Sequence, residues 1–225
     1  MIKIGLKALL SSAAAMAVLT LLVTAAFPSA AKEGNIIRER VMIFGDSLSA
    51  AYGIDPKEGW VMLMAATMRP HGIAVVNASI SGETSRGGLG RIKGDLARLS
   101  PTIVVLALGA NDGLRGLPNA ETRKNLDAII TAARAARARG VMVGLQIPPN
   151  YGLDYARQFR DMYADLAVKF KLPFVPFLLE GFADKLEYFQ ADRVHPTAAA
   201  QSKILDNVMP AVWQAIALTN AASRR

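Results

Sequence analysis

Apolar and polar positions follow two repeating patterns along the chain from about residue 40 onward. Short runs rich in Val, Ile and Leu lack strict in-and-out alternation, which is typical of strands buried on both faces of a sheet. Longer segments with helical periodicity separate them, and this order predicts a parallel sheet covered by helices on both sides. The predicted strands are residues 41–44, 73–77, 103–108, 141–147 and 173–177.

The helical segments carry apolar residues at spacings of three and four, as expected for helices that pack one face on a core. Three stripes are clear, within residues 120–139, within 153–171 and from Ile204 to Ile216, with a kink expected at Pro210. Trp60 follows Gly59 at the start of another expected helix and is assigned to the core. No internal repeat or low-complexity linker interrupts the pattern, so a single domain is expected over residues 32–225.

Residues 1–31 have the composition of an export signal. Lys3 and Lys7 precede an uncharged run from Ala8 to Ala31, which ends in the small residues Ser29-Ala30-Ala31. This order predicts a cleaved signal peptide and a periplasmic location. The alternative is an uncleaved membrane anchor, because the uncharged run is long enough to span a bilayer.

Composition excludes several kinds of chemistry. The chain has no cysteine, so disulfides, a thiol nucleophile and cysteine-based metal sites are excluded. The net charge of +8 has its densest cluster at Arg134, Arg137 and Arg139, just before Gly140. We interpret this cluster as the solvated last turn of a helix with glycine as its C-terminal stop. No aromatic residues lie among these arginines, which argues against nucleic-acid binding, whereas transient contact with a lipid or membrane surface is compatible with the positive charge.

Each predicted strand ends in a polar or glycine-rich segment, and in a parallel sheet these ends share the edge where ligands bind. The segments begin at Gly45-Asp46-Ser47, Asn77, Gly109-Ala110-Asn111-Asp112, Gln146 and Ala191-Asp192. One such end is commonplace, but five together indicate an assembled site.

Ser47 has two interpretations. With Asp46 it caps a following helix, or it is a nucleophile, which requires a base and a group that orients the base. Of the two histidines, His71 lies in a turn at the far edge of the sheet, so His195 is the only plausible base. Asp192 precedes it by three residues, a spacing that on a helical turn brings both side chains to one face. Asp46 is given a structural, capping role.

An acyl-transfer site also needs donors for the oxyanion. The candidates are the Ser47 backbone N–H, expected to be free at a helix start, the Gly82 N–H and the Asn111 side-chain amide. Two bland alternatives remain open. Gly82 is then an ordinary turn glycine, and Asn111 is part of a turn, because Asn-Asp-Gly is a strong turn signal.

Together, Gly45-Asp46-Ser47-Leu48, Gly82, Gly109-Ala110-Asn111-Asp112 and Asp192-x-x-His195 resemble the four blocks of the SGNH, or GDSL, hydrolase superfamily. Residues 77–85, 109–116 and 149–152 are similar to the periplasmic thioesterase I/protease I/lysophospholipase group and its arylesterase relatives. The resemblance implies a three-layer α/β/α fold with a flavodoxin-like five-stranded parallel sheet. It also implies a Ser47, His195 and Asp192 triad, an oxyanion hole at Ser47, Gly82 and Asn111, and no cofactor or metal.

The resemblance further implies an open groove beside residues 147–152, so substrate contacts are expected at Ile147, Pro148, Asn150 and Tyr151. The predicted function is hydrolysis of small acyl esters or thioesters through an acyl-enzyme, of arylesterase, thioesterase or lysophospholipase type. The alternatives are a carbohydrate O-acetylesterase of the same superfamily and an exported binding protein without turnover. An intact set of Ser, His and Asp argues against the second, because a binding protein has no need for all three.

Overall fold

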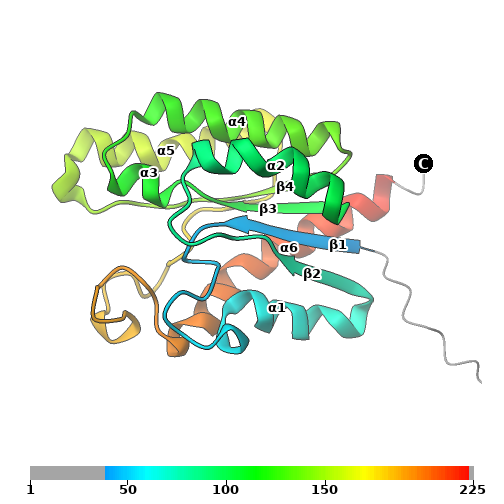
Figure 1. Cartoon of the computed structure of the whole chain (residues 1–225), viewed down its shortest axis with the longest axis horizontal. Coiled ribbons are helices and arrows are strands. Elements are labelled where there is room, and N and C mark those ends of the chain that lie inside the picture. The colour runs from blue at the N-terminus through cyan, green and yellow to red at the C-terminus, as the bar shows by residue number, and fades with distance from the viewer. Residues whose placement is uncertain (1–38, 223–225) are drawn as a thin grey trace, which may run out of the picture. The chain divides into compact units, whose positions relative to one another are not determined.

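The computed structural model describes residues 39–222, and within this range five parallel strands form one sheet in the order β2-β1-β3-β4-β5 (Figure 1). This is the flavodoxin-like order, so the predicted fold class is confirmed. The strands are β1 (Glu39–Gly45), β2 (Ile73–Asn77), β3 (Ile103–Ala107), β4 (Arg139–Val143) and β5 (Phe174–Val175).

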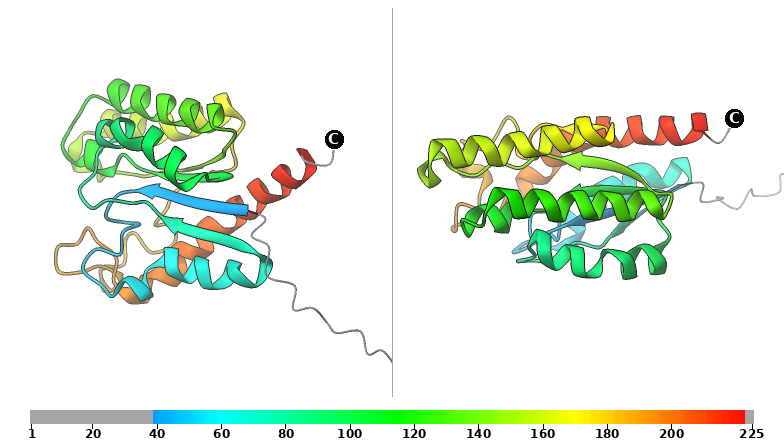
Figure 2. Two further views of the ribbon diagram at one scale, coloured as in Figure 1. Left: turned by 45° about the vertical axis from the view of Figure 1, so that its right-hand side comes forward. Right: turned by 90° about the horizontal axis from the view of Figure 1, so that it is seen from above.

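Helices cover both faces of the sheet and complete three layers (Figures 1 and 2). One face carries α1 (Trp60–Met68) and the long C-terminal helix α6 (Gln201–Ala222), which continues through Pro210. The other carries α2 (Ser85–Leu99), α4 (Asn119–Ala135) and α5 (Leu153–Phe170), together with the short helix α3 (Ala110–Leu114). The predicted helical stripes therefore correspond to α4, α5 and α6.

The core lies on both sides of the central strands, as their uninterrupted apolar sequences predict. The side chains of β1 from Val41 to Phe44 and those of β3 are all buried. Trp60 is also buried, and its indole N–H donates to the Leu48 carbonyl at 3.0 Å. This bond satisfies the one polar atom of the indole and ties α1 to the segment that follows β1.

The fourth strand and the arginine cluster differ from expectation. β4 begins at Arg139 and ends at Val143, so Arg139 and Gly140 belong to the strand. The predicted helix ends earlier, at Ala135, and Arg137 takes the left-handed conformation in the connection, with φ 61°. Gly140 is therefore not a helix stop. It packs against Leu172, where an added Cβ would lie 3.2 Å from Cδ2, so a larger residue here would require the Leu172 side chain to shift.

The carboxyl ends of the strands lie at one edge of the sheet, where the longest connections gather on the left of Figure 1. His71 lies at the opposite edge, exposed, with its ring edge-on to Trp213 at 5.3 Å between centroids. Within residues 39–222, no helix is both long and apolar enough to cross a membrane. The predicted signal peptide lies outside the described residues.

Candidate active site

Ser47 follows β1 in a tight turn rather than at the start of a helix, so that expectation was wrong. The turn is closed by the N–H groups of Ser49 and Ala50, which donate to the Asp46 carbonyl at 3.1 and 3.0 Å. Gly45 makes the close approach possible, because an added Cβ would lie 2.7 Å from the Ala107 carbonyl oxygen. The Ser47 N–H has no acceptor within residues 39–222 and is available to a ligand.

His195 joins Ser47 to Asp192 in one chain of contacts. Its Nε2 lies 2.8 Å from the Ser47 Oγ, and its Nδ1 lies 2.7 Å from Asp192 Oδ2. The spacing predicts that Asp192 and His195 lie on one helical turn, but the segment that carries them is not helical. Asp192 Oδ1 accepts the N–H groups of Val194 and His195 at 2.9 and 3.0 Å, which curls the segment into an Asx-type turn.

The same contacts fix the protonation of the site. Hydrogen bonds from the His195 backbone N–H, the His195 ring and the Val194 N–H lower the pKa of Asp192 from 3.8 to about 2. Asp192 is therefore a carboxylate at neutral pH and can only accept hydrogen bonds. The proton of a neutral His195 ring then resides on Nδ1, which leaves the Nε2 lone pair facing the Ser47 hydroxyl.

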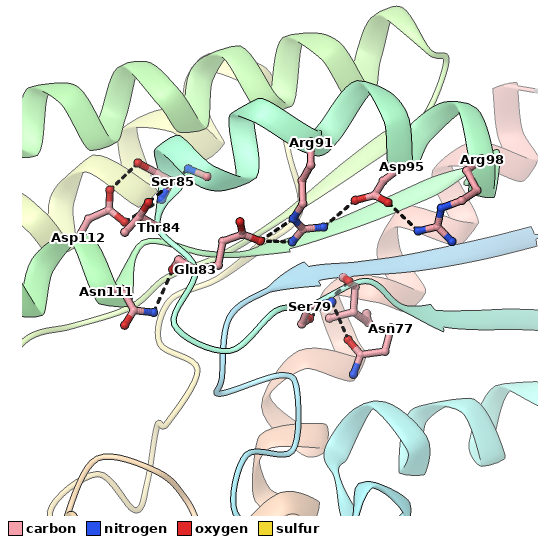
Figure 3. A network of polar contacts seen from close by, with 12 residues as sticks. Asn77, Ser79, Glu83, Thr84, Ser85, Arg91, Asp95, Arg98, Asn111 and Asp112 are labelled. Atoms are coloured by element: carbon pink, nitrogen blue, oxygen red, sulfur yellow. Dashed lines mark hydrogen bonds and ion pairs between the residues drawn. The ribbon is translucent and has the colours of Figure 1, made fainter.

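The loop after β2 brings Gly82 and Asn111 to the same edge. Asn111, on α3, donates from Nδ2 to the Glu83 carbonyl at 2.9 Å, so the two elements that carry the candidate oxyanion donors are tied together (Figure 3). Gly82 has φ 77°, and no atom lies within 4 Å of an added Cβ. Backbone conformation, and not crowding by neighbouring atoms, therefore requires glycine at this position.

Asp112 anchors this loop from behind, a role that sequence reasoning missed by treating Asn-Asp-Gly as a turn signal. Its buried carboxylate accepts the Ser85 N–H at 2.8 Å and the Ser85 hydroxyl at 2.5 Å (Figure 3). Along α2, the half-buried Arg91 bridges Glu83 and Asp95. The end of this loop that leads into α2 is thus held by Asp112 and Arg91.

Beside Ser47 lies a pocket of about 570 Å³ with a mainly apolar lining. Ile147 and Pro148 line it as predicted, whereas Asn150 and Tyr151 lie in the adjoining short 3-10 helix Pro149–Tyr151 and are not among the lining residues. Substrate contact by those two residues stays a prediction. The apolar lining that sequence reasoning did not identify includes Leu48, Leu114, Phe177, Leu179, Ala183, Phe189 and Val194.

Tyr52 covers the histidine, another contact without a sequence signal. Its ring lies 4.4 Å from the His195 ring between centroids, at an angle of 40°. Gln190 fixes the two segments to each other, because its Nε2 donates to the carbonyls of Tyr52 and Pro196 at 2.8 and 3.0 Å. The histidine is therefore held by Asp192 on one ring nitrogen and by an aromatic face.

Asp46 is structural, but it does not cap a helix as expected, because a turn follows it. It is fully buried, and Oδ1 accepts the Leu48 N–H at 3.1 Å, while Oδ2 has no partner within residues 39–222. Burial, reinforced by the charge of Asp112, raises the pKa of Asp46 from 3.8 to about 7. A folded state that holds this proton up to neutral pH binds more protons than the unfolded state between about pH 4 and 7.

We therefore expect the contribution of Asp46 to the free energy of unfolding to fall as the pH rises from about 4 to 7, by on the order of 4 kcal/mol. Urea denaturation of wild type and Asp46→Asn across this range measures it, because the variant lacks the titrating group. The wild-type minus variant difference should decline with pH and level off above about pH 7. Asp55→Asn, at an exposed position of the same connection, should retain the wild-type slope. A constant difference between wild type and Asp46→Asn would contradict the prediction.

A serine in contact with a histidine–aspartate pair, at the carboxyl edge of a parallel sheet, defines the class of α/β serine hydrolases. The model of the GDSL-like lipase/acylhydrolase family matches residues 43–203. The chain therefore belongs to the GDSL-like lipase/acylhydrolase family and is a carboxylic ester or thioester hydrolase.

Relatives support the same assignment. Esterase TesA of Pseudomonas aeruginosa is 44% identical over 174 residues, which cover 76% of this chain and 87% of that protein. Thioesterase 1/protease 1/lysophospholipase L1 of Escherichia coli strain K12 is 38% identical over 168 residues, covering 75% and 80% of the two chains. A crystal structure of TesA matches with a TM-score of 0.76 at 43% identity, covering 79% of this chain and 99% of that one.

Proposed function

We propose that Ser47 is the nucleophile, His195 the general base and Asp192 the residue that orients it, in the hydrolysis of acyl esters and thioesters. The observation that carries this proposal is the 2.8 Å contact between Ser47 Oγ and His195 Nε2 at the wall of the apolar pocket. This distance allows the ring to take the hydroxyl proton as the oxygen attacks an acyl carbonyl.

The reaction then follows from the groups around Ser47. Attack places a negative charge on the carbonyl oxygen, and the candidate donors for it are the free Ser47 N–H, the Gly82 N–H and the second N–H of the Asn111 amide. His195 returns its proton to the departing alcohol or thiol, which leaves an acyl group on Ser47. Water, activated by the same ring, releases the acid.

The pocket supports a substrate with an extended acyl chain, because an apolar volume of this size is larger than an acetyl group needs. We infer that aryl esters, thioesters and lysophospholipids with medium-length chains are better substrates than acetylated sugars. A series of p-nitrophenyl esters and acyl-CoA thioesters of rising chain length, with acetylated xylan for comparison, tests this. Highest kcat/KM on the acetylated sugar would favour the O-acetylesterase alternative.

A reactive serine distinguishes the enzyme from a binding protein. A fluorophosphonate probe should label Ser47 in the wild-type chain, because the probe reacts with an activated hydroxyl. The labelled peptide, identified by mass spectrometry, should contain residue 47. A chain that stays unlabelled and hydrolyses none of the esters would favour the binding-protein alternative.

We also propose that the protein is exported to the periplasm. The charged, apolar and small-residue order of residues 1–31 supports this proposal. The chain has no cysteine that an oxidising compartment could oxidise, so its composition is compatible with export. Fractionation of expressing cells, with mass determination of the N-terminus, tests both export and cleavage.

The Asn111 amide offers a separate test of the oxyanion site. We expect Asn111→Ala to lower kcat by about 10²- to 10³-fold, because the lost donor faces charge that develops only in the transition state. KM should change little. Asn125→Ala is the matched control, since that amide donates to Ser85 Oγ in the network behind the loop and does not line the pocket. An equal fall in kcat for both variants would indicate a loop effect and no oxyanion contact.

A further inference from the structure

Arg193 lies within the Asp192–His195 turn and lines the pocket beside Ser47, although the triad makes no use of it. Its backbone has φ 58°, a conformation that costs an L-residue energy and that glycine adopts freely. Its N–H donates to the Gln190 carbonyl at 2.9 Å, which fixes the turn. A strained position that carries a long cationic side chain at the site suggests a selected function.

The charges around the pocket give that side chain a particular effect. Among the residues that line it, the only titratable ones are Asp192, Arg193 and His195. Asp192 is held as a carboxylate by its hydrogen bonds and is engaged with His195. Without Arg193 the one permanent charge at the wall would be negative, and the wall would repel an anionic substrate.

Within residues 39–222, Arg193 makes no ion pair, and its side chain is exposed. It therefore has free donors to offer a ligand. A guanidinium presents several N–H groups in a planar fork, which suits a phosphate better than a neutral hydroxyl. The apolar pocket and this cation are next to each other, so the combination fits a molecule with an acyl chain and a phosphate separated by few bonds.

We propose that Arg193 is a specificity-determining residue that selects acyl esters bearing a phosphate close to the ester, of the acylglycerol phosphate class, over uncharged esters of the same chain length. This inference rests on the proposed esterase function. The phosphate takes no part in the bond changes at the reacting carbonyl and carries the same charge before and during attack, so the contact should act on KM more than on kcat.

The test compares 1-decanoyl-glycerol 3-phosphate with 1-decanoyl-glycerol, both below their critical micelle concentrations. Arg193→Gln keeps a non-glycine residue at the left-handed position and removes only the charge. We expect the ratio of kcat/KM for the phosphate ester to that for the neutral ester to fall about tenfold in this variant, mainly through KM. Arg193→Lys should retain most of the wild-type ratio.

Arg86→Gln is the matched control, because it removes the same charge from an exposed position of α2 that does not line the pocket. An unchanged ratio in Arg193→Gln, or an equal fall in Arg86→Gln, would overturn the proposal. Calorimetric Kd values for the two esters with Ser47→Ala, with and without Arg193→Gln, test selection without turnover. If Ser47→Ala hydrolysed the esters at the wild-type rate, the esterase mechanism would be refuted. The difference in Kd between the two esters would still test the role of Arg193, because binding is measured without turnover.

Discussion

Ser47→Ala is expected to lower kcat by about 10⁴- to 10⁶-fold on esters and thioesters alike. The reason is geometric. The Ser47 hydroxyl is the nucleophile candidate that contacts His195, and alanine leaves the imidazole with no oxygen to deprotonate. The remaining donors still stabilise an oxyanion, so hydrolysis by water at a low residual rate is expected. Steady-state kinetics on a p-nitrophenyl ester and on an acyl-CoA measure the effect.

Ser49→Ala provides the control for this variant. Ser49 lies in the same turn, is buried, and its hydroxyl makes no hydrogen bond within residues 39–222. The substitution therefore removes the same atom two residues away without disturbing a polar contact, and kcat should stay within about twofold of wild type. Full activity of Ser47→Ala, or an equal loss in Ser49→Ala, would refute the nucleophile assignment.

The position of the site at one edge was predictable because it depends on strand direction alone. Apolar runs such as residues 41–44, alternating with helical segments, are typical of a parallel sheet covered on both faces. Once the strands are parallel, every segment that follows a strand lies at the same edge. Ser47, Asn111 and His195 are therefore close in space although they are far apart in sequence, and no knowledge of loop conformation is needed.

The errors arose where an apolar sequence lies outside regular structure. The apolar residues Leu145 and Ile147 extend the predicted strand to residues 141–147, and both are indeed buried. The ladder nevertheless stops at Val143. An added Cβ at Gly144 would lie 2.2 Å from the Pro176 carbonyl oxygen, so the segments around Gly144 and Pro176 converge there. The residues that follow Gly144 turn toward the pocket. The sequence indicates that Leu145 and Ile147 are buried, but it does not indicate which segment they pack against.

The connection from Phe177 to His195 shows the same limit more strongly. It contributes much of the pocket lining, yet it has no extended helical or strand periodicity to read. Its shape depends on single contacts, among them the antiparallel bridge between Phe189 and Pro196 and the Gln190 side chain. The Asp192-x-x-His195 spacing suggested a helical turn, whereas an aspartate that accepts two backbone N–H groups produces the same proximity without a helix.

The turn formed by Asp192 leads to the second large expected effect on kcat. Asp192→Asn should lower kcat by about 10³- to 10⁴-fold, although the side chain changes by one atom. The asparagine oxygen can still accept the N–H groups of Val194 and His195, so the turn should survive. The amide NH₂ then faces His195 Nδ1 and donates to it. The ring proton moves to Nε2, which points a donor at Ser47 where the mechanism requires an acceptor.

Kinetics at neutral pH, with circular dichroism to confirm folding, measure this loss. Asp154→Asn is the control, because Asp154 forms an exposed ion pair with Arg157 at the same spacing of three residues, and the substitution removes the same charge away from the site. That variant should keep wild-type kcat.

The pH profile separates the two roles open to Asp192. A carboxylate with a pKa of about 2 stays ionised above about pH 3, so its loss should lower the rate throughout the neutral range and should not merely shift the profile. Activity in Asp192→Asn that recovers fully at higher pH would show that Asp192 only tunes the titration of His195, and its orienting role would have to be abandoned.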